Sequence, residues 1–145
     1  MSTLGQLVEG YLAGPRDIRA AIAGKWSTYE VVCHLADSEQ AWAHRIKRVI
    51  AEDKPLLIGY DESQFAASLD YAQRDLEEDL RLIELTRQQL GRRLKSLSDA
   101  DLNRKGVHNE RGLVTLGEML EIEIDHIAHH LRFVADKRKA LGLPA

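Results

Sequence analysis

The sequence of 145 residues predicts an all-α fold, most simply a four-helix bundle with a broken N-terminal helix. Apolar residues recur at helical spacing in long segments rich in Ala, Leu, Glu, Arg and Gln, whereas alternating β-branched residues are scarce. Hydrophobic residues make up 44% of the chain and charged residues 30%, which is typical of one globular domain of this length. We therefore expect residues 1–145 to form a single helical domain with essentially no β-strand.

The first two predicted helices have different boundaries. A first segment over residues 4–23 is broken at Gly14-Pro15, because proline removes a backbone donor and clashes with the preceding turn. The second helix, over about 27–51, begins with a capping box in which the Ser27 hydroxyl accepts from the amide of Glu30 and the Glu30 carboxylate reaches back. Its apolar residues fall at helical spacing: Val31, Leu35, Trp42, Ile46 and Val49.

The last two predicted helices are separated by a long polar connection. A capping arrangement at 61–64 begins a long third helix. The connection that follows, from residue 98 to 112, is longer than is usual between bundle helices, and such loops often carry function. A second capping box, at Thr115 and Glu118, begins the last helix, which runs to about Leu141. One apolar stripe marks the third helix: Leu69, Ala72, Leu76, Leu80, Ile83, Leu90, Leu94 and Leu97.

Charge and cysteine content argue against several classes of protein. Twenty Lys and Arg residues are balanced by twenty-three Asp and Glu residues, and this net charge of -3 disfavours nucleic-acid binding. The single Cys33 cannot form an internal disulfide, and the N-terminal residues have neither the basic nor the apolar region of a secretion signal. No apolar run approaches the about 20 residues that span a bilayer. We expect a cytoplasmic protein with no nucleic-acid or membrane partner.

The six histidines are the most informative feature, because three of them share one turn of the last helix, in the segment 125–130. At about 100° per residue, His126 and His130 lie about 40° apart on the helix surface, so their imidazoles can converge on one ion. Helical zinc sites use this His-x-x-x-His spacing. His126 with His129 is the weaker alternative, and both His129 and His44 point away from the predicted site.

A third histidine, His34, lies among apolar residues on the predicted inward side of the second helix. Together with His126 and His130 it would provide three neutral nitrogen ligands and leave coordination positions open, as catalytic metal sites require. Zn²⁺, Ni²⁺, Mn²⁺ and Fe²⁺ all accept imidazole ligands, so the sequence does not name the ion. The alternative is three partly buried histidines satisfied by neighbouring carbonyls or carboxylates. We favour a metal site, because inward-facing polar groups are costly unless they are paired.

Several short motifs follow one another along the chain: Trp26-Ser27, His34-Leu35-Ala36-Asp37, Tyr60-Asp61, Gly106-Val107-His108 through Gly112 to Thr115-Leu116, and His126-x3-His130. In order and spacing they resemble the DinB/YfiT-like family, and the similarity extends from about Leu4 to Arg138. The resemblance implies an up-down-down-up four-helix bundle, often dimeric, with a divalent metal ion held by His34, His126 and His130. The family includes metal-dependent transferases that use low-molecular-weight thiols, a thiol-dependent isomerase and hydrolases. Arg132-Phe133 departs from the Gln-Ile of many relatives, which affects the predicted pocket rim.

Four other residues have both a functional and a structural interpretation. Asp37, one turn after His34, could orient that imidazole or act as a base, or it could be an ordinary surface carboxylate. Glu123, in the last helix, has the same options and could also bind the metal directly. His108 in the long loop is either a substrate contact or, more simply, a solvent-exposed residue. Cys33 lies about 100° around the helix from His34, so we interpret it as a small buried hydrophobe and not as a ligand or nucleophile.

Three functions remain open at this stage. The leading hypothesis is a metal-dependent enzyme that activates water or a low-molecular-weight thiol, hence a hydrolase or a thiol transferase acting on a small molecule. The alternative is a non-catalytic metal-binding or dimer-forming helical bundle. A helical interaction module without metal is the third. The resemblance also predicts a homodimer, in keeping with the general preference for two-fold assemblies.

Overall fold

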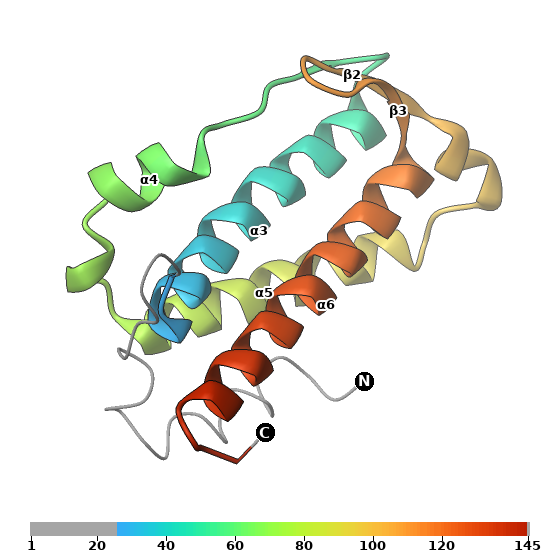
Figure 1. The fold of residues 1–145 in the computed structure, drawn as a ribbon. Coiled ribbons are helices and arrows are strands. Elements are labelled where there is room, and N and C mark those ends of the chain that lie inside the picture. The colour runs from blue at the N-terminus through green and yellow to red at the C-terminus, as the bar shows by residue number, and fades with distance from the viewer. Residues whose placement is uncertain (1–25, 145) are drawn as a thin grey trace.

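The computed structural model describes residues 26–144, and three long helices dominate this part of the chain. They are α3 (Thr28–Ala51), α5 (Leu76–Leu94) and α6 (Leu116–Ala140). Figure 1 shows that α3 and α5 run in the same direction, whereas α6 returns in the opposite one. This is the down-down-up part of the predicted topology. The predicted broken helix over 4–23 lies outside the described residues.

Side-chain caps fix where the three helices begin. In α3, the Ser27 hydroxyl accepts from the Glu30 amide at 3.1 Å, and the Glu30 carboxylate accepts from the Ser27 amide at 3.3 Å. Thr115 and Glu118 form the second predicted capping box at the start of α6. The α5 cap, Asp75, accepts from the amide of Glu78. Each cap satisfies amides that have no partner within the helix, so the helix starts follow local sequence.

The predicted long third helix is wrong, because the chain divides it into three elements. These are α4 (Glu62–Ser68), a 3-10 turn η1 (Tyr71–Gln73) and α5. Between the first two, Asp70 adopts a left-handed backbone with φ 49°, which a continuing helix does not permit. Leu69 is therefore 47% exposed instead of lying on a buried stripe, and Ala72 is also exposed.

A small three-stranded sheet corrects the expectation of essentially no β-strand. Strand β1 (Leu56–Leu57) pairs in parallel with β2 (Lys105–His108), which pairs antiparallel with β3 (Gly112–Thr115). The connection between α5 and α6 is thus a 3-10 turn, η2 (Asp99–Asn103), followed by a hairpin. These strands are too short to show a period in the sequence, and β1 is a strand only because it reaches a distant partner.

The apolar core follows α3 along its length. One cluster contains Ile46, Val49, Leu57, Leu116 and Met119, close to the sheet. A second contains Val31, Leu35, Ile83, Ile127 and Val134, toward the other end of the bundle. Helix α3 therefore packs against both of its long neighbours, and its inward side chains share the interior with theirs.

No helix in the described range 26–144 is long and apolar enough to cross a membrane.

Gly106 gives a direct test of how tightly the sheet packs on the core. A Cβ atom at this position would lie 2.7 Å from Leu57 Cδ1 and 3.0 Å from Val49 Cγ2, and both neighbours are fully buried. Gly106→Ala should therefore destabilise the fold by about 1–3 kcal/mol through overpacking. Gly91→Ala in α5 is the control: its Cβ meets nothing within 4 Å, so we expect stabilisation of about 0.5–1 kcal/mol from helix propensity. Urea unfolding midpoints measure both, and equal midpoints for the two variants would contradict the packing.

Candidate metal centre

Three imidazoles from two helices meet inside the bundle. His34 comes from α3, and His126 and His130 lie one turn apart on α6. The Nε2 atom of His126 lies 3.2 Å from Nε2 of His34 and 3.0 Å from Nε2 of His130. The three ligand atoms of this group all lie within 4.8 Å of one another. The histidine spacing seen in the sequence therefore corresponds to one compact cluster.

The donor set fits a divalent ion. Two nitrogen ligands at about 2.0–2.1 Å from one ion lie about 2.8–3.4 Å apart when the angle at the ion is between about 90° and 109°. The two measured Nε2 separations, 3.2 Å and 3.0 Å, fall in that range. Within the cluster itself the imidazoles cannot satisfy one another, because His126 Nε2 carries at most one proton and faces two neighbours. A cation is the partner that suits all three nitrogens at once.

Burial keeps these imidazoles neutral, which is the form that binds metal. The His34 side chain is fully buried, and this burial lowers its pKa to about 4, with a further contribution from the neighbouring His126. Burial likewise lowers the pKa of His130 to about 3, together with the nearby His126 and His34. The pKa of His126 is also lowered, mainly by burial. At neutral pH the cluster presents nitrogen lone pairs, not positive charges.

Two ring nitrogens on the far side of the imidazoles have no partner. His34 Nδ1 and His126 Nδ1 are both buried, and neither makes a hydrogen bond. The Trp26 ring covers His34, with the ring centroids 5.0 Å apart. His129, the weaker alternative ligand, is exposed and packs its ring edge against Phe133. His44 is exposed as well. The structure thus brings His130, not His129, to the cluster.

Asp37 lies one turn after His34 and is already engaged. Its Oδ2 accepts from the Tyr71 hydroxyl and its Oδ1 from Arg74 Nη1, both at 2.7 Å. Arg74 also donates to both carboxylate oxygens of Asp79, at 3.0 and 2.6 Å. Asp37 is therefore neither an isolated surface carboxylate nor a free one, and it joins α3 to the start of α5.

A second buried polar group lies beside the histidines, and sequence reasoning found only one of its members. Glu39 and Glu123 are 3% and 7% exposed. Arg87 of α5 donates to Glu39 Oε2 at 2.8 Å and reaches Glu123 Oε1 at 3.5 Å. Burial, with the neighbouring Glu39 carboxylate, raises the pKa of Glu123 to about 8. Glu39 lies on the inward side of a helix predicted from sequence, and this charge at an apolar position was the available signal.

Two other candidates also have definite places. His108 is only 5% exposed, so the interpretation of it as a solvent-exposed loop residue is wrong. It lies in β2, and its Nδ1 accepts from the Glu110 amide. Cys33 is fully buried, as predicted, and burial raises its pKa to about 12, so its thiol is not a ready nucleophile.

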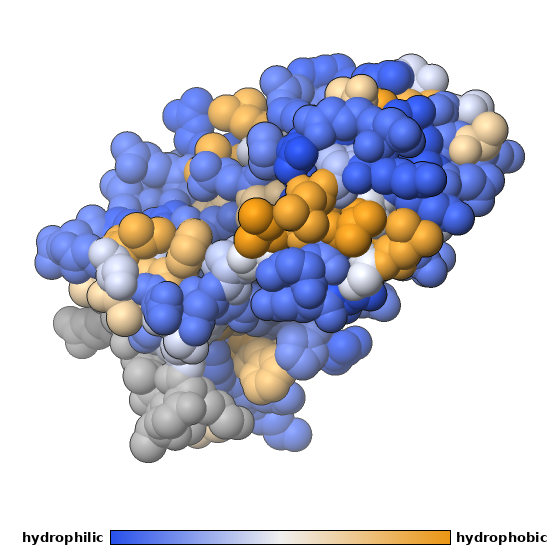
Figure 2. Space-filling view, turned by 90° about the horizontal axis from the view of Figure 1, so that it is seen from above, coloured by the Kyte–Doolittle hydropathy of each residue, from blue (hydrophilic) through white to orange (hydrophobic). Residues whose placement is uncertain are grey.

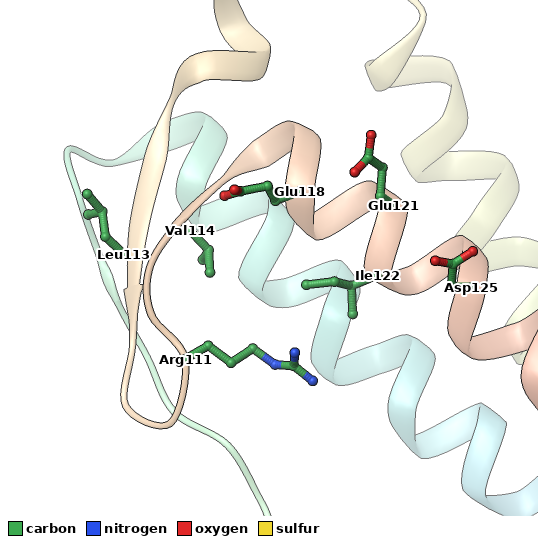
Figure 3. A pocket seen from close by; sticks show the side chains of 7 residues that line it. All are labelled: Arg111, Leu113, Val114, Glu118, Glu121, Ile122 and Asp125. Atoms are coloured by element: carbon green, nitrogen blue, oxygen red, sulfur yellow. The ribbon is translucent and has the colours of Figure 1, made fainter.

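A separate hollow of about 360 Å³ lies between the hairpin and the outer side of α6. Figure 3 shows Arg111 and Val114 reaching toward it from the hairpin, with Ile122 on the helix. None of the three clustered histidines lines it; its acidic lining side chains are Glu118, Glu121 and Asp125. Because these carboxylates are exposed, the hollow is a feature of the surface and not a continuation of the buried cluster.

Comparison with known proteins agrees with this architecture. The family model described as the DinB superfamily matches residues 10–134. A protein of Oceanobacillus iheyensis, named "Putative metal-dependent hydrolase OB0782", is 34% identical over 119 residues, which cover 81% of this chain and 69% of that protein. YfiT of Bacillus subtilis, which has the same type of name, is 27% identical over 120 residues, or 82% of this chain and 67% of its own length.

The solved structure of YfiT from Bacillus subtilis is described as having an unusual four-helix bundle topology. It superposes with a TM-score of 0.88 at 23% sequence identity, covering 97% of this chain and 82% of that one. The match confirms the predicted all-α four-helix bundle, to which the small sheet is a minor addition. With the family model matching most of its length, this chain belongs to the DinB superfamily.

Proposed function

We propose that this protein is a metal-dependent enzyme in which His34, His126 and His130 hold a divalent metal ion and a small molecule is the substrate. The observation that supports it most directly is the convergence of three neutral imidazoles, through their Nε2 atoms, on one point inside the bundle. The names of the relatives as metal-dependent hydrolases favour the same chemistry. Three protein ligands leave positions on an ion for a reactant, which distinguishes a catalytic from a purely structural site.

When bound, an ion such as Zn²⁺, Ni²⁺, Mn²⁺ or Fe²⁺ lowers the pKa of a water molecule or of a low-molecular-weight thiol and so supplies a nucleophile near neutral pH. Hydrolysis follows in the first case and thiol transfer in the second. The protein's own thiol does not serve, because Cys33 is buried and its pKa is raised. The nucleophile therefore comes from solvent or from a second small molecule.

For Asp37 we propose an orienting role. Both of its carboxylate oxygens already accept hydrogen bonds, from Tyr71 and Arg74, so a proton taken up there would disrupt two contacts. A carboxylate held in this way fixes α3 against the start of α5 and keeps the turn that carries His34 in place. A base that acts directly on the substrate would need a free oxygen.

We also propose that the protein works as a homodimer in the cytoplasm. The surface supports self-association: Figure 2 shows a band of apolar side chains across the face seen from above, with hydrophilic side chains on both sides. Several large apolar side chains in and around the sheet are exposed, namely Leu56, Ile58, Val107 and Leu113. Light scattering across micromolar to millimolar protein tests this, since a constant mass of 16.4 kDa would contradict it.

Activity is tested with the metal-loaded and the chelator-treated protein on a panel of ester, amide and electrophilic substrates, each with and without a low-molecular-weight thiol. We expect turnover that requires the metal, and the thiol dependence separates a transferase from a hydrolase. Stoichiometric metal without turnover of any substrate would instead favour the non-catalytic metal-binding bundle. Turnover that survives removal of the ion would contradict the proposal.

The ligand assignment predicts unequal effects of neighbouring histidines. His34→Ala, His126→Ala and His130→Ala should each abolish stoichiometric metal binding, because each removes one of three convergent nitrogens. His129→Ala is the matched control and should keep its metal, because His129 is exposed and outside the cluster. Elemental analysis of protein purified without a chelating column measures the metal, and circular dichroism checks the fold. Loss of metal from His129→Ala with retention by His130→Ala would show that the other histidine pair is the true one.

The lowered histidine pKa values predict the pH dependence of the metal-free protein. Above about pH 6.5 neither the folded nor the unfolded chain protonates these imidazoles. Below it the unfolded chain takes up protons, whereas folded His34 and His130, with pKa values of about 4 and about 3, do not. The free energy of unfolding should therefore fall as pH drops from about 6.5 toward 4. Metal binding should persist below pH 6.5 and weaken as pH nears 4.

Urea unfolding at several pH values measures this slope, in the presence of a chelator that removes trace metal. His44→Ala is the control, because His44 is exposed on α3 and lies outside the cluster. Its slope should match that of the unaltered protein. His34→Ala should reduce the slope, and a pH-independent stability between pH 6.5 and 4 would overturn the electrostatic description of the cluster.

A further inference from the structure

Two buried polar atoms near the histidine cluster lack partners and have complementary chemistry. One is Nδ1 of His126 and the other is Oε2 of Glu123. Both belong to α6, and Glu123 precedes His126 by three residues, the spacing at which side chains on one helix face are neighbours. Side chains on a helix also lean toward its N-terminus, which directs a side chain at position 126 toward the turn that contains Glu123.

The chemistry of the proposed metal site makes one of these atoms a donor. When the Nε2 atom of a neutral imidazole binds an ion, its single proton is on Nδ1. In His126 that N–H group is buried without an acceptor, a costly arrangement. Among the buried side-chain atoms of residues 26–144 that lack a partner, Glu123 Oε2 is the carboxylate oxygen, which can only accept when ionised.

Charge around Glu123 supports the same pairing. Arg87 makes its short contact, 2.8 Å, with Glu39 and only a 3.5 Å contact with Glu123 Oε1. One guanidinium thus serves two buried carboxyl groups, which leaves Glu123 incompletely paired. Arg87 also lowers the pKa of His126, so its guanidinium acts electrostatically on both Glu123 and this imidazole. A cation bound by the histidines would supply the positive charge that Glu123 lacks.

We propose that Glu123 is the positioning residue of the metal centre: its carboxylate accepts a hydrogen bond from His126 Nδ1 and so fixes the orientation in which Nε2 faces the ion. This inference rests on the proposed function, because it assumes that His126 is a ligand. Arg87, which also pairs with Glu39, contacts the other carboxylate oxygen, Oε1. In the described structure no hydrogen bond joins His126 Nδ1 to Glu123 Oε2, so this role requires the Glu123 side chain to turn toward His126 when the ion binds.

The alternative role for Glu123 is purely structural, as one end of an ion pair that joins α5 to α6. The two roles make different predictions. A structural residue changes the stability of the metal-free protein, and its loss leaves the affinity for the ion unchanged. A positioning residue changes the affinity for the ion and the proton signal of the ligand imidazole.

The experiment compares Glu123→Met, Glu123→Gln and a control, Glu121→Met, which removes an exposed carboxylate from the same helix. Glu123→Met should fold, because replacing a buried charge by an apolar side chain of similar size is often neutral or stabilising, and Arg87 keeps Glu39 as its partner. Zn²⁺ is the probe, and its dissociation constant is measured by chelator competition at pH 7.5.

We expect Glu123→Met to weaken Zn²⁺ binding by roughly 10–100-fold, the usual effect of losing a carboxylate that orients a ligand histidine. Glu123→Gln, which keeps an oxygen acceptor, should lose less, and Glu121→Met should bind like the unaltered protein. In the Zn²⁺-loaded protein, NMR should show a protected Nδ1–H proton assigned to His126, and this signal should disappear in Glu123→Met.

The outcomes separate this inference from the proposed function. If Glu123→Met binds Zn²⁺ as tightly as the unaltered protein while His130→Ala does not bind it, the metal site stands and the positioning role is wrong. If His34→Ala, His126→Ala and His130→Ala all bind Zn²⁺ normally, the proposed function fails and this inference fails with it. A structure of the Zn²⁺-loaded protein with His126 Nδ1 bonded to a group other than Glu123 would also overturn it.

Discussion

The rotation of α3 about its own axis is the constraint on which the rest of the site depends. This helix packs against α5 and α6, and its neighbouring residues contribute to different parts of the interior. His34 faces the α6 histidines, Asp37 faces Arg74, and Glu39 faces Arg87. A rotation by one residue, about 100°, would remove all three contacts at once. The capping box at Ser27 and the apolar residues of α3 hold this rotation in place.

Helix α3 contributes one carboxylate to each of two further groups of charged side chains. In each, one arginine is shared by two carboxylates: Arg74 by Asp37 and Asp79, and Arg87 by Glu39 and Glu123. Each group has one more acidic than basic side chain, and in the second group burial raises the pKa of Glu123 to about 8, so this carboxyl is largely protonated at neutral pH in the metal-free protein. A cation close to such a carboxyl group favours its ionised form. The acidic side chains of these two groups therefore suit a divalent ion nearby, in addition to the three nitrogens.

The sequence predicts the histidine cluster well because its geometry is almost entirely local. His126 and His130 share a helix face by spacing, and His34 needs only to lie on an inward face. The break at Asp70 and the strand at Leu56–Leu57 were not predictable in this way, because the first depends on a single left-handed residue and the second on a partner about fifty residues away. Arg87 was missed because the sequence does not tell which side of α5 faces the two glutamates.

The parallel course of α3 and α5 has a consequence for how the chain folds. Two parallel helices cannot be joined by a short turn, so residues 52–75 must cross from one end of the bundle to the other. The contacts between these helices are therefore distant in sequence, and the entropy of closing a long loop is lost before their packing compensates for it. A bundle of antiparallel neighbours forms mostly local contacts and folds quickly. This chain should reach its native state more slowly, with the hydrogen bonds of Arg74 and Tyr71 to Asp37 completing the crossing at its far end.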